Sequence, residues 1–186
     1  MNKAMDLRIL AGVVAGLAMA GCGPDEEQAK PGGTGAVRTP VAALPAGLFV
    51  DQAPPGSRGV AEIKADAGAT GEIVVHGRIG GRVRPFVDGA AVFLLADTGM
   101  KTCADLHGDA CKTPWDYCCE PRDSLAARTA TVQIVDAEGQ PLRIDLDGRH
   151  GMSPLAEVTV AGEVAHRDGG SLVINARKIH VKRLEG

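Results

Sequence analysis

Apolar and polar positions after residue 71 alternate with the two-residue period of β-strands. Residues 73–79, 130–135 and 142–146 show this alternation, and residues 90–96 form a continuous apolar run that ends at the turn signal Asp97-Thr98-Gly99. Alternation of this kind places one face of a strand in a core and the other in water. Gly77 lies inside the first segment, at a position where a strand can coil sharply.

The C-terminal part of the chain predicts a long β-hairpin. Apolar side chains share one face of residues 157–164, with Gly162 among them, and Arg167-Asp168-Gly169-Gly170 then leads into the apolar segment 172–181. Two glycines between such segments are typical of a hairpin turn. After Gly71 the sequence predicts no long helix, only a turn or two around residues 123–127. The fold class is therefore all-β, and a small barrel would hide the strand edges.

Four segments together resemble the strand order of an OB-fold barrel, particularly the anticodon-binding type: residues 73–79, 91–99, 158–164 and 172–179. The resemblance implies a small OB-like barrel of five to six strands over residues 72–183. Residues 142–146 would form an extra hairpin arm, and a cysteine-rich loop, residues 100–122, would be inserted between the second and third strands. An OB-fold implies a binding face and no particular chemistry.

Nucleic acid is excluded as a partner by the charge and by the position of the aromatic rings. OB-folds that bind single strands stack bases on aromatic rings over a basic groove. Here the single Trp and the single Tyr both lie in the cysteine-rich loop, and the formal net charge of the chain is −3. A weakly acidic chain has no electrostatic footprint for nucleic acid.

The first 21 residues have the layout of a secretory signal. Lys3 and Arg8 precede 13 uncharged residues, 9–21, which fall short of the roughly 20 that a membrane-spanning helix needs. The end of this run, Leu17-Ala18-Met19-Ala20-Gly21-Cys22, resembles the lipobox of bacterial lipoproteins. The resemblance implies a signal peptide over residues 1–21, a lipid on Cys22, and a place in the cell envelope facing the periplasm or the exterior. A glycine, Gly23, rather than an aspartate directly after the cysteine resembles lipoproteins that are exported to an outer membrane. The alternative is an ordinary signal peptide with Cys22 as a stray thiol.

Residues 22–71 are predicted to form a flexible linker between the lipid and the folded domain. The segment is rich in Gly, Pro and Ala, a composition that buries too little apolar surface to offset the entropy of ordering. Residues 41–50 are the exception, because they carry several large apolar side chains. We expect this stretch to dock on the folded domain, and a partner-binding segment is the alternative.

The cysteine-rich loop holds all the cysteines that remain after Cys22: Cys103, Cys111, Cys118 and Cys119. Thiols outside the cytoplasm tend to be oxidised, so an even number predicts two disulfides. Adjacent cysteines form a strained ring. The expected bridges therefore join Cys103 and Cys111 separately to Cys118 and Cys119, in either order, and would staple the loop.

A metal site is the main alternative for the same cysteines. Together with His107 they provide enough soft ligands for Zn(II) or Cu(I). Four acidic residues could add acceptors around the ligands: Asp105, Asp109, Asp116 and Glu120. The spacing is not that of a zinc ribbon, and no Cys-x-x-Cys motif is present. A reactive disulfide, such as a vicinal Cys118–Cys119 ring, is a third possibility.

The sequence predicts a binding protein rather than an enzyme. Trp115 and Tyr117 would be natural anchors for a partner if their rings were exposed. No catalytic motif is found. We therefore expect a membrane-anchored lipoprotein that acts, without a cofactor, as a binding or envelope-assembly module for an envelope protein or a small ligand. The alternative is a metal-binding or metal-delivery lipoprotein.

Overall fold

A computed structural model describes residues 43–106 and 111–182. Its elements, in chain order, are β1 (Arg58–Gly59), α1 (Val60–Ala65), β2 (Glu72–Ile79), β3 (Val92–Ala96), the 3₁₀ turns Cys103–Asp105 and Pro114–Asp116, α2 (Arg122–Arg128), β4 (Thr129–Gln133), β5 (Glu157–Asp168) and β6 (Ser171–Val181). Strands therefore dominate, and the helices are short. The predicted Cys22, signal peptide and His107 lie outside the described residues. Within the described residues, no helix is both long enough and apolar enough to cross a bilayer.

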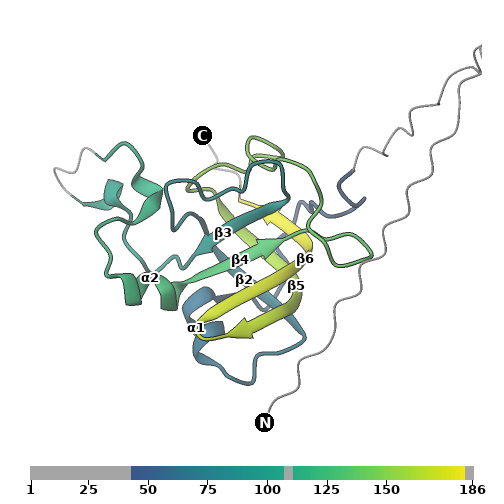
Figure 1. The fold of residues 1–186 in the computed structure, drawn as a ribbon, viewed down its shortest axis with the longest axis horizontal. Coiled ribbons are helices and arrows are strands. Elements are labelled where there is room, and N and C mark those ends of the chain that lie inside the picture. Colours follow the sequence, from purple (N-terminus) through teal and green to yellow (C-terminus); the bar gives the residue numbers. More distant parts are fainter. Residues whose placement is uncertain (1–42, 107–110, 183–186) are drawn as a thin grey trace, which may run out of the picture. The chain divides into compact units, whose positions relative to one another are not determined.

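Five strands close into a barrel, as the sequence predicted (Figure 1). Their order is β2-β3-β4-β6-β5, and β5 pairs back with β2 along Glu72–Arg78. All pairs in the ring are antiparallel except β4 with β6, which are parallel. The short β1 adds a sixth strand beside β2. The structure is therefore a small OB-like barrel, and the cysteine-rich loop lies between its second and third strands.

Alternation along the strands builds the barrel core. On β2, Ile73, Val75 and Ile79 are buried, and their neighbours on the other face are at least partly exposed. Gly77 completes the buried face because a Cβ there would lie 2.6 Å from the Ala96 carbonyl oxygen. The close approach lets β2 bend so that it pairs with β3 on one side and with β5 on the other.

The segment before residue 72 is ordered from at least Leu44 onward, so the predicted linker is too long. Leu48 is buried in the core, as expected for a docked segment, and so are Val60 and Ile63 of α1. Figure 1 shows α1 at one end of the barrel. The linker prediction failed because it rested on the average composition of the segment. A few well-spaced apolar side chains are enough to dock the segment on the barrel core.

The predicted arm over residues 142–146 is not a strand, although all of these residues are described. Only one isolated bridge, Val135 to Pro141, forms there. The alternation is nevertheless real, because Leu146 is buried in the barrel core and Leu142 packs against it. The Leu142 amide donates to Ile134 and its carbonyl accepts from Ala91. The segment thus contributes core side chains without a strand ladder. The predicted short helical turn near residues 123–127 is confirmed as α2.

Arg167 fastens α1 to the β5–β6 hairpin, which predicts a large effect on stability. Its guanidinium donates to the carbonyls of Ile63 at 3.0 Å, Ala69 at 3.2 Å and Lys64 at 3.4 Å. We expect Arg167→Ala to lower the free energy of unfolding in urea by about 1.5–3 kcal/mol, because charged donors are lost from buried acceptors. Arg177→Ala is the control. It breaks an exposed ion pair with Glu163 and should cost less than about 1 kcal/mol. Equal losses in both variants would contradict this role.

Candidate metal centre

A buried carboxylate lies just before the cysteine-rich loop. Asp97, directly after β3, accepts hydrogen bonds from the backbone amides of Ala61 at 2.9 Å and Gly99 at 2.8 Å. It thereby joins the start of the loop to α1. Four residues after Gly99 comes Cys103, at the first position of a 3₁₀ turn. Thr102 and Asp105 form a reciprocal capping box around this turn. Cys103 is therefore held in place by local structure, and it is 1% exposed.

The second half of the loop is held by Tyr117 and by two glycines of the barrel rim. Tyr117 is 1% exposed and packs with Ala96 and Met100 in a small second core. Gly80 lies so close to the loop that a Cβ there would be 2.7 Å from the Trp115 carbonyl oxygen. The same carbonyl accepts a hydrogen bond from the Gly81 amide at 2.8 Å. The barrel therefore fixes the backbone just before Cys118.

These two anchors bring three sulfurs and one carboxylate together. The ligand atoms of Cys103, Cys111, Asp116 and Cys118 all lie within 4.8 Å of one another. The sulfurs of Cys103 and Cys118 are 3.6 Å apart. Two sulfurs on one tetrahedral zinc ion, each at about 2.3 Å, would be separated by about 3.8 Å. The spacing is thus suitable for a shared metal ion.

The predicted disulfides are not found among the described residues. A disulfide requires sulfurs about 2.05 Å apart. The Cys103–Cys118 distance of 3.6 Å and the Cys118–Cys119 distance of 4.0 Å are both far longer. The sequence argument rested on an even count of thiols and on the compartment, and neither fixes the side-chain geometry.

Asp116 is a ligand candidate, although the sequence predicted it only as an acceptor around the ligands. One carboxylate oxygen accepts from the Thr113 hydroxyl at 3.0 Å, and the other accepts from the Cys118 amide at 2.9 Å. These bonds orient the carboxylate beside the sulfurs. The other predicted acceptors have other roles or cannot be placed. Asp105 caps its turn, Glu120 accepts from Ser124, and Asp109 and His107 lie outside the described residues.

The electrostatics of the cluster favour protonated thiols in the absence of a cation. Burial raises the pKa of Cys103. Hydrogen bonding with Cys103, followed by that with Cys119, raises the pKa of Cys118 well above its usual range. Two contacts act in the opposite sense, because hydrogen bonding with the Cys118 thiol and the Cys119 amide that donates to the Cys103 sulfur both lower the pKa of Cys103. A bound cation reverses the balance by displacing the protons from coordinating thiols.

The two aromatic residues do not form the exposed pair that was predicted. Tyr117 is buried, so its ring cannot contact a partner from this position. Trp115 is partly buried, and its indole N–H donates to the Val83 carbonyl at 3.0 Å. Both rings therefore attach the loop to the barrel. The predicted role as partner anchors required exposed rings, and the rings instead pack the loop.

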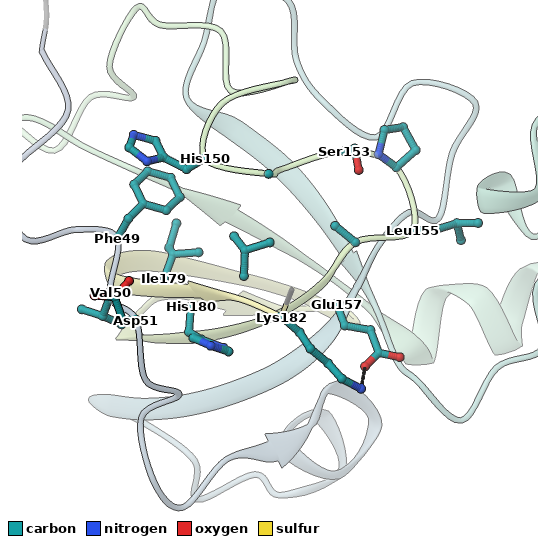
Figure 2. A pocket seen from close by; sticks show the side chains of 14 residues that line it. Phe49, Val50, Asp51, His150, Ser153, Leu155, Glu157, Ile179, His180 and Lys182 are labelled. Atoms are coloured by element: carbon teal, nitrogen blue, oxygen red, sulfur yellow. Dashed lines mark hydrogen bonds and ion pairs between the residues drawn. The ribbon is translucent and has the colours of Figure 1, made fainter. Parts of the chain in front are cut away.

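A cleft of about 1170 Å³, which the sequence did not predict, lies where β5 begins and β6 ends (Figure 2). Phe49 and His150 stack at one side of it, with ring centroids 4.0 Å apart. At the other side Lys182 pairs with Glu157 at 2.9 Å. The cleft combines residues far apart in the sequence, which left no local motif to find. Its lining mixes both charges and apolar groups and points to no particular ligand.

Glu157 at this cleft predicts a dependence of stability on pH. The hydrogen bond from Lys182, followed by contacts with Arg78, lowers the pKa of Glu157. Its stabilising effect is therefore present above the unfolded pKa near 4.5 and is lost as the pH falls through the lower folded value. We expect wild type to exceed Glu157→Gln in unfolding free energy at neutral pH, by less than about 1 kcal/mol. Urea unfolding at a series of pH values checks this. A difference that persists in acid would contradict it.

Taken together, the described residues contain a compact site of soft and carboxylate ligands. Three cysteines and one aspartate suit zinc, and the three sulfurs alone suit Cu(I). Comparison with models of known protein families finds no match, and neither does comparison with curated protein sequences.

Proposed function

We propose that this protein binds a soft metal ion, Zn(II) or Cu(I), through Cys103, Cys111 and Cys118, with Asp116 as the fourth ligand for zinc. The observation that carries the proposal is the convergence of the four ligand atoms within 4.8 Å. Cys103 and Asp116 lie in the two 3₁₀ turns, Cys111 lies between these turns, and Cys118 follows the second one. Such a convergence is not needed to fold the barrel, because the loop has its own apolar anchor in Tyr117.

The ligand set distinguishes this site from a closed structural zinc site. A structural site has four permanent ligands, commonly all Cys and His. Here Cys119 lies outside the group, and the fourth position is filled by a carboxylate, which is a poor ligand for Cu(I) and an exchangeable one for Zn(II). A site of this kind supports binding and delivery of a metal. The three thiolates supply the affinity, and the fourth position supplies access.

The membrane anchor is part of the same proposal. The lipobox-like sequence before Cys22 supports a lipid-anchored protein outside the cytoplasm. In that compartment the cysteines can also become oxidised. The competing state is then a protein whose four loop cysteines form two disulfides. The sulfurs of Cys103 and Cys118, 3.6 Å apart, are close enough for a first bridge after a small movement.

One experiment separates the metal-bound form from the oxidised form. The full-length protein is purified in detergent from its own cell envelope, and metal content and thiols are measured on the same sample. We expect one zinc or copper ion per chain and four loop thiols that react after chelation and denaturation. Four oxidised cysteines and no metal would overturn the proposal. It would also be overturned if the reduced protein did not bind one equivalent of Co(II), whose visible absorption reports tetrahedral thiolate ligation.

Cys22→Ser tests the anchor. We expect the variant to lose all labelling by a fatty-acid probe and to leave the membrane fraction, because no other lipid attachment is predicted. Fractionation with in-gel detection of the label checks both effects. Cys119→Ser is the matched control and should be labelled like wild type. A Cys22→Ser protein that is still labelled would contradict the prediction.

A further inference from the structure

The proposed metal site has a closed side and an open side. Cys103 is 1% exposed, whereas Cys118 is exposed and Cys111 and Asp116 are partly buried. An ion held between them would therefore be shielded at Cys103 and reachable from solvent near Cys118. A site used only for stability would gain nothing from such access. The asymmetry indicates that ligands exchange from one side.

An open groove of about 610 Å³ leads to that side. Its lining consists of Arg82, Val83, Arg84, Asp116 and Cys118. Two proposed metal ligands therefore share the groove with two arginines of the β2–β3 connection. The volume is in the range of small-molecule sites. The arginines give the groove a positive rim directly beside the metal position.

The arginines are available to a ligand. Arg84 contacts Asp88 at 3.5 Å, but the two side chains are 82% and 85% exposed, so this pair is weak and readily exchanged. Val83, between the arginines, is 60% exposed. With Val87 it forms the pair of large apolar side chains left exposed in the described part of the chain. The groove therefore combines positive charge with a small apolar surface.

We infer that this groove admits a small thiol that carries carboxylates, and that such a thiol removes the metal from the site or delivers it there. The inference rests on the proposed function. A thiolate is the class of ligand that competes for a soft metal ion. Carboxylates on the same molecule match the planar fork of a guanidinium. A positive rim also raises the rate of encounter with an anion.

The order of exchange follows from ligand strength first and exposure second: the exchangeable Asp116 carboxylate leaves before the sulfurs, and the buried Cys103 leaves last. The incoming sulfur forms a bond to the metal, and the bond from the metal to the Asp116 carboxylate breaks, with no change in oxidation state. If the thiol arrives protonated, its proton passes to the departing carboxylate or to water. Further incoming sulfurs then replace Cys118 and Cys111 in turn, and each departing thiolate takes up the proton that the incoming thiol gives up. Cys103, on the closed side, is replaced last in the same way. Delivery is the same sequence in reverse.

Stopped-flow transfer from Co(II)-loaded full-length protein tests the inference. The probes are dimercaptosuccinate, an anionic dithiol, and dithiothreitol, a neutral one, and the decay of the Co(II) absorption gives the rate. We expect the double variant Arg82→Gln/Arg84→Gln to transfer metal to dimercaptosuccinate about 10-fold more slowly than wild type at low salt. Transfer to dithiothreitol should be unchanged. Salt should slow wild type toward the variant.

Matched variants keep the outcome interpretable. Arg177→Gln, on β6, removes an exposed arginine that does not line the groove and should transfer metal like wild type. Arg82→Glu/Arg84→Glu should reverse the salt effect, because the rim becomes negative. Equal rates with the anionic dithiol for wild type and the Gln variant, or equal slowing with both dithiols, would overturn the inference. Failure to load Co(II) would instead overturn the proposed function.

Discussion

Replacing Cys103 with serine is expected to weaken metal binding by about 10²–10³-fold. Structural zinc sites with four ligands bind with about 10–16 kcal/mol, so one ligand contributes about 3–4 kcal/mol. Cys103 should lie at the upper end of that range because it is the buried ligand. Its sulfur also accepts a hydrogen bond from the Cys119 backbone amide and lies 3.6 Å from the Cys118 sulfur. Competition between the protein and a chromophoric chelator measures the affinity directly.

Cys119→Ser is the matched control for this result. Cys119 is adjacent in sequence to a proposed ligand and has the same chemistry, but its sulfur lies outside the group of ligand atoms. The backbone amide that donates to Cys103 is retained in the variant. We expect the affinity of Cys119→Ser to stay within about threefold of wild type, since only a neighbour of the ligands changes. Equal losses for Cys103→Ser and Cys119→Ser would mean that the sulfurs act as a loose cluster, and the assignment of ligands would be wrong.

The barrel strands could be predicted from sequence because the patterns that mark them are local in the chain. Strands β5 and β6 are marked by alternation and by the Gly169-Gly170 turn, β2 and β4 by alternation, and β3 by a continuous apolar run that ends at a turn signal. Gly77 could be singled out because glycine inside a strand indicates a bend or a close contact. What alternation cannot provide is the pairing partner. This is why residues 142–146 were expected to form a strand and instead pack as an irregular segment.

The candidate site was only partly predictable, for a related reason. The loop and its cysteines could be found from composition, but the choice among ligands depends on which side chains the folded loop brings together. Asp116 was expected to be an acceptor around the ligands, like the three other acidic residues of the loop. The Thr113 and Cys118 contacts that orient it appear only in the folded loop. Residue type can be read from sequence, whereas convergence of side chains over 15 positions cannot.

Tyr117 was expected to be an exposed anchor, but its burial instead positions a ligand of the proposed metal site. A lone tyrosine beside cysteines suggests a surface anchor, but here the ring fills a small core with Ala96 and Met100. Its backbone adopts a left-handed conformation, with φ of 54°. Such a conformation is costly for a bulky residue and persists only when packing holds it. Burial of the ring therefore fixes the backbone from which Cys118 extends.

The hydroxyl of Tyr117 provides the means to test this. It is buried and has no hydrogen-bond partner of good geometry among the described residues, and burial raises the pKa of Tyr117. An unsatisfied buried polar group costs about 1–3 kcal/mol. We therefore expect Tyr117→Phe to raise the free energy of unfolding by about 1 kcal/mol, because it removes that cost and keeps the ring. A loss of stability in this variant would show that the hydroxyl is bonded, with the nearby Arg78 guanidinium as the donor.

Tyr117→Ala should have the opposite and larger effect, lowering the free energy of unfolding by about 3–5 kcal/mol as expected for a buried aromatic ring. Loss of the ring also frees the backbone next to Cys118. We expect metal affinity to fall about 10–100-fold, the range seen when groups that position ligands are lost. Urea unfolding and chelator competition measure the two effects on the same proteins. If Tyr117→Ala lost stability but bound metal like wild type, the ring would serve the barrel alone. Unchanged affinity in Tyr117→Phe, combined with the loss in Tyr117→Ala, would assign the positioning of Cys118 to the ring.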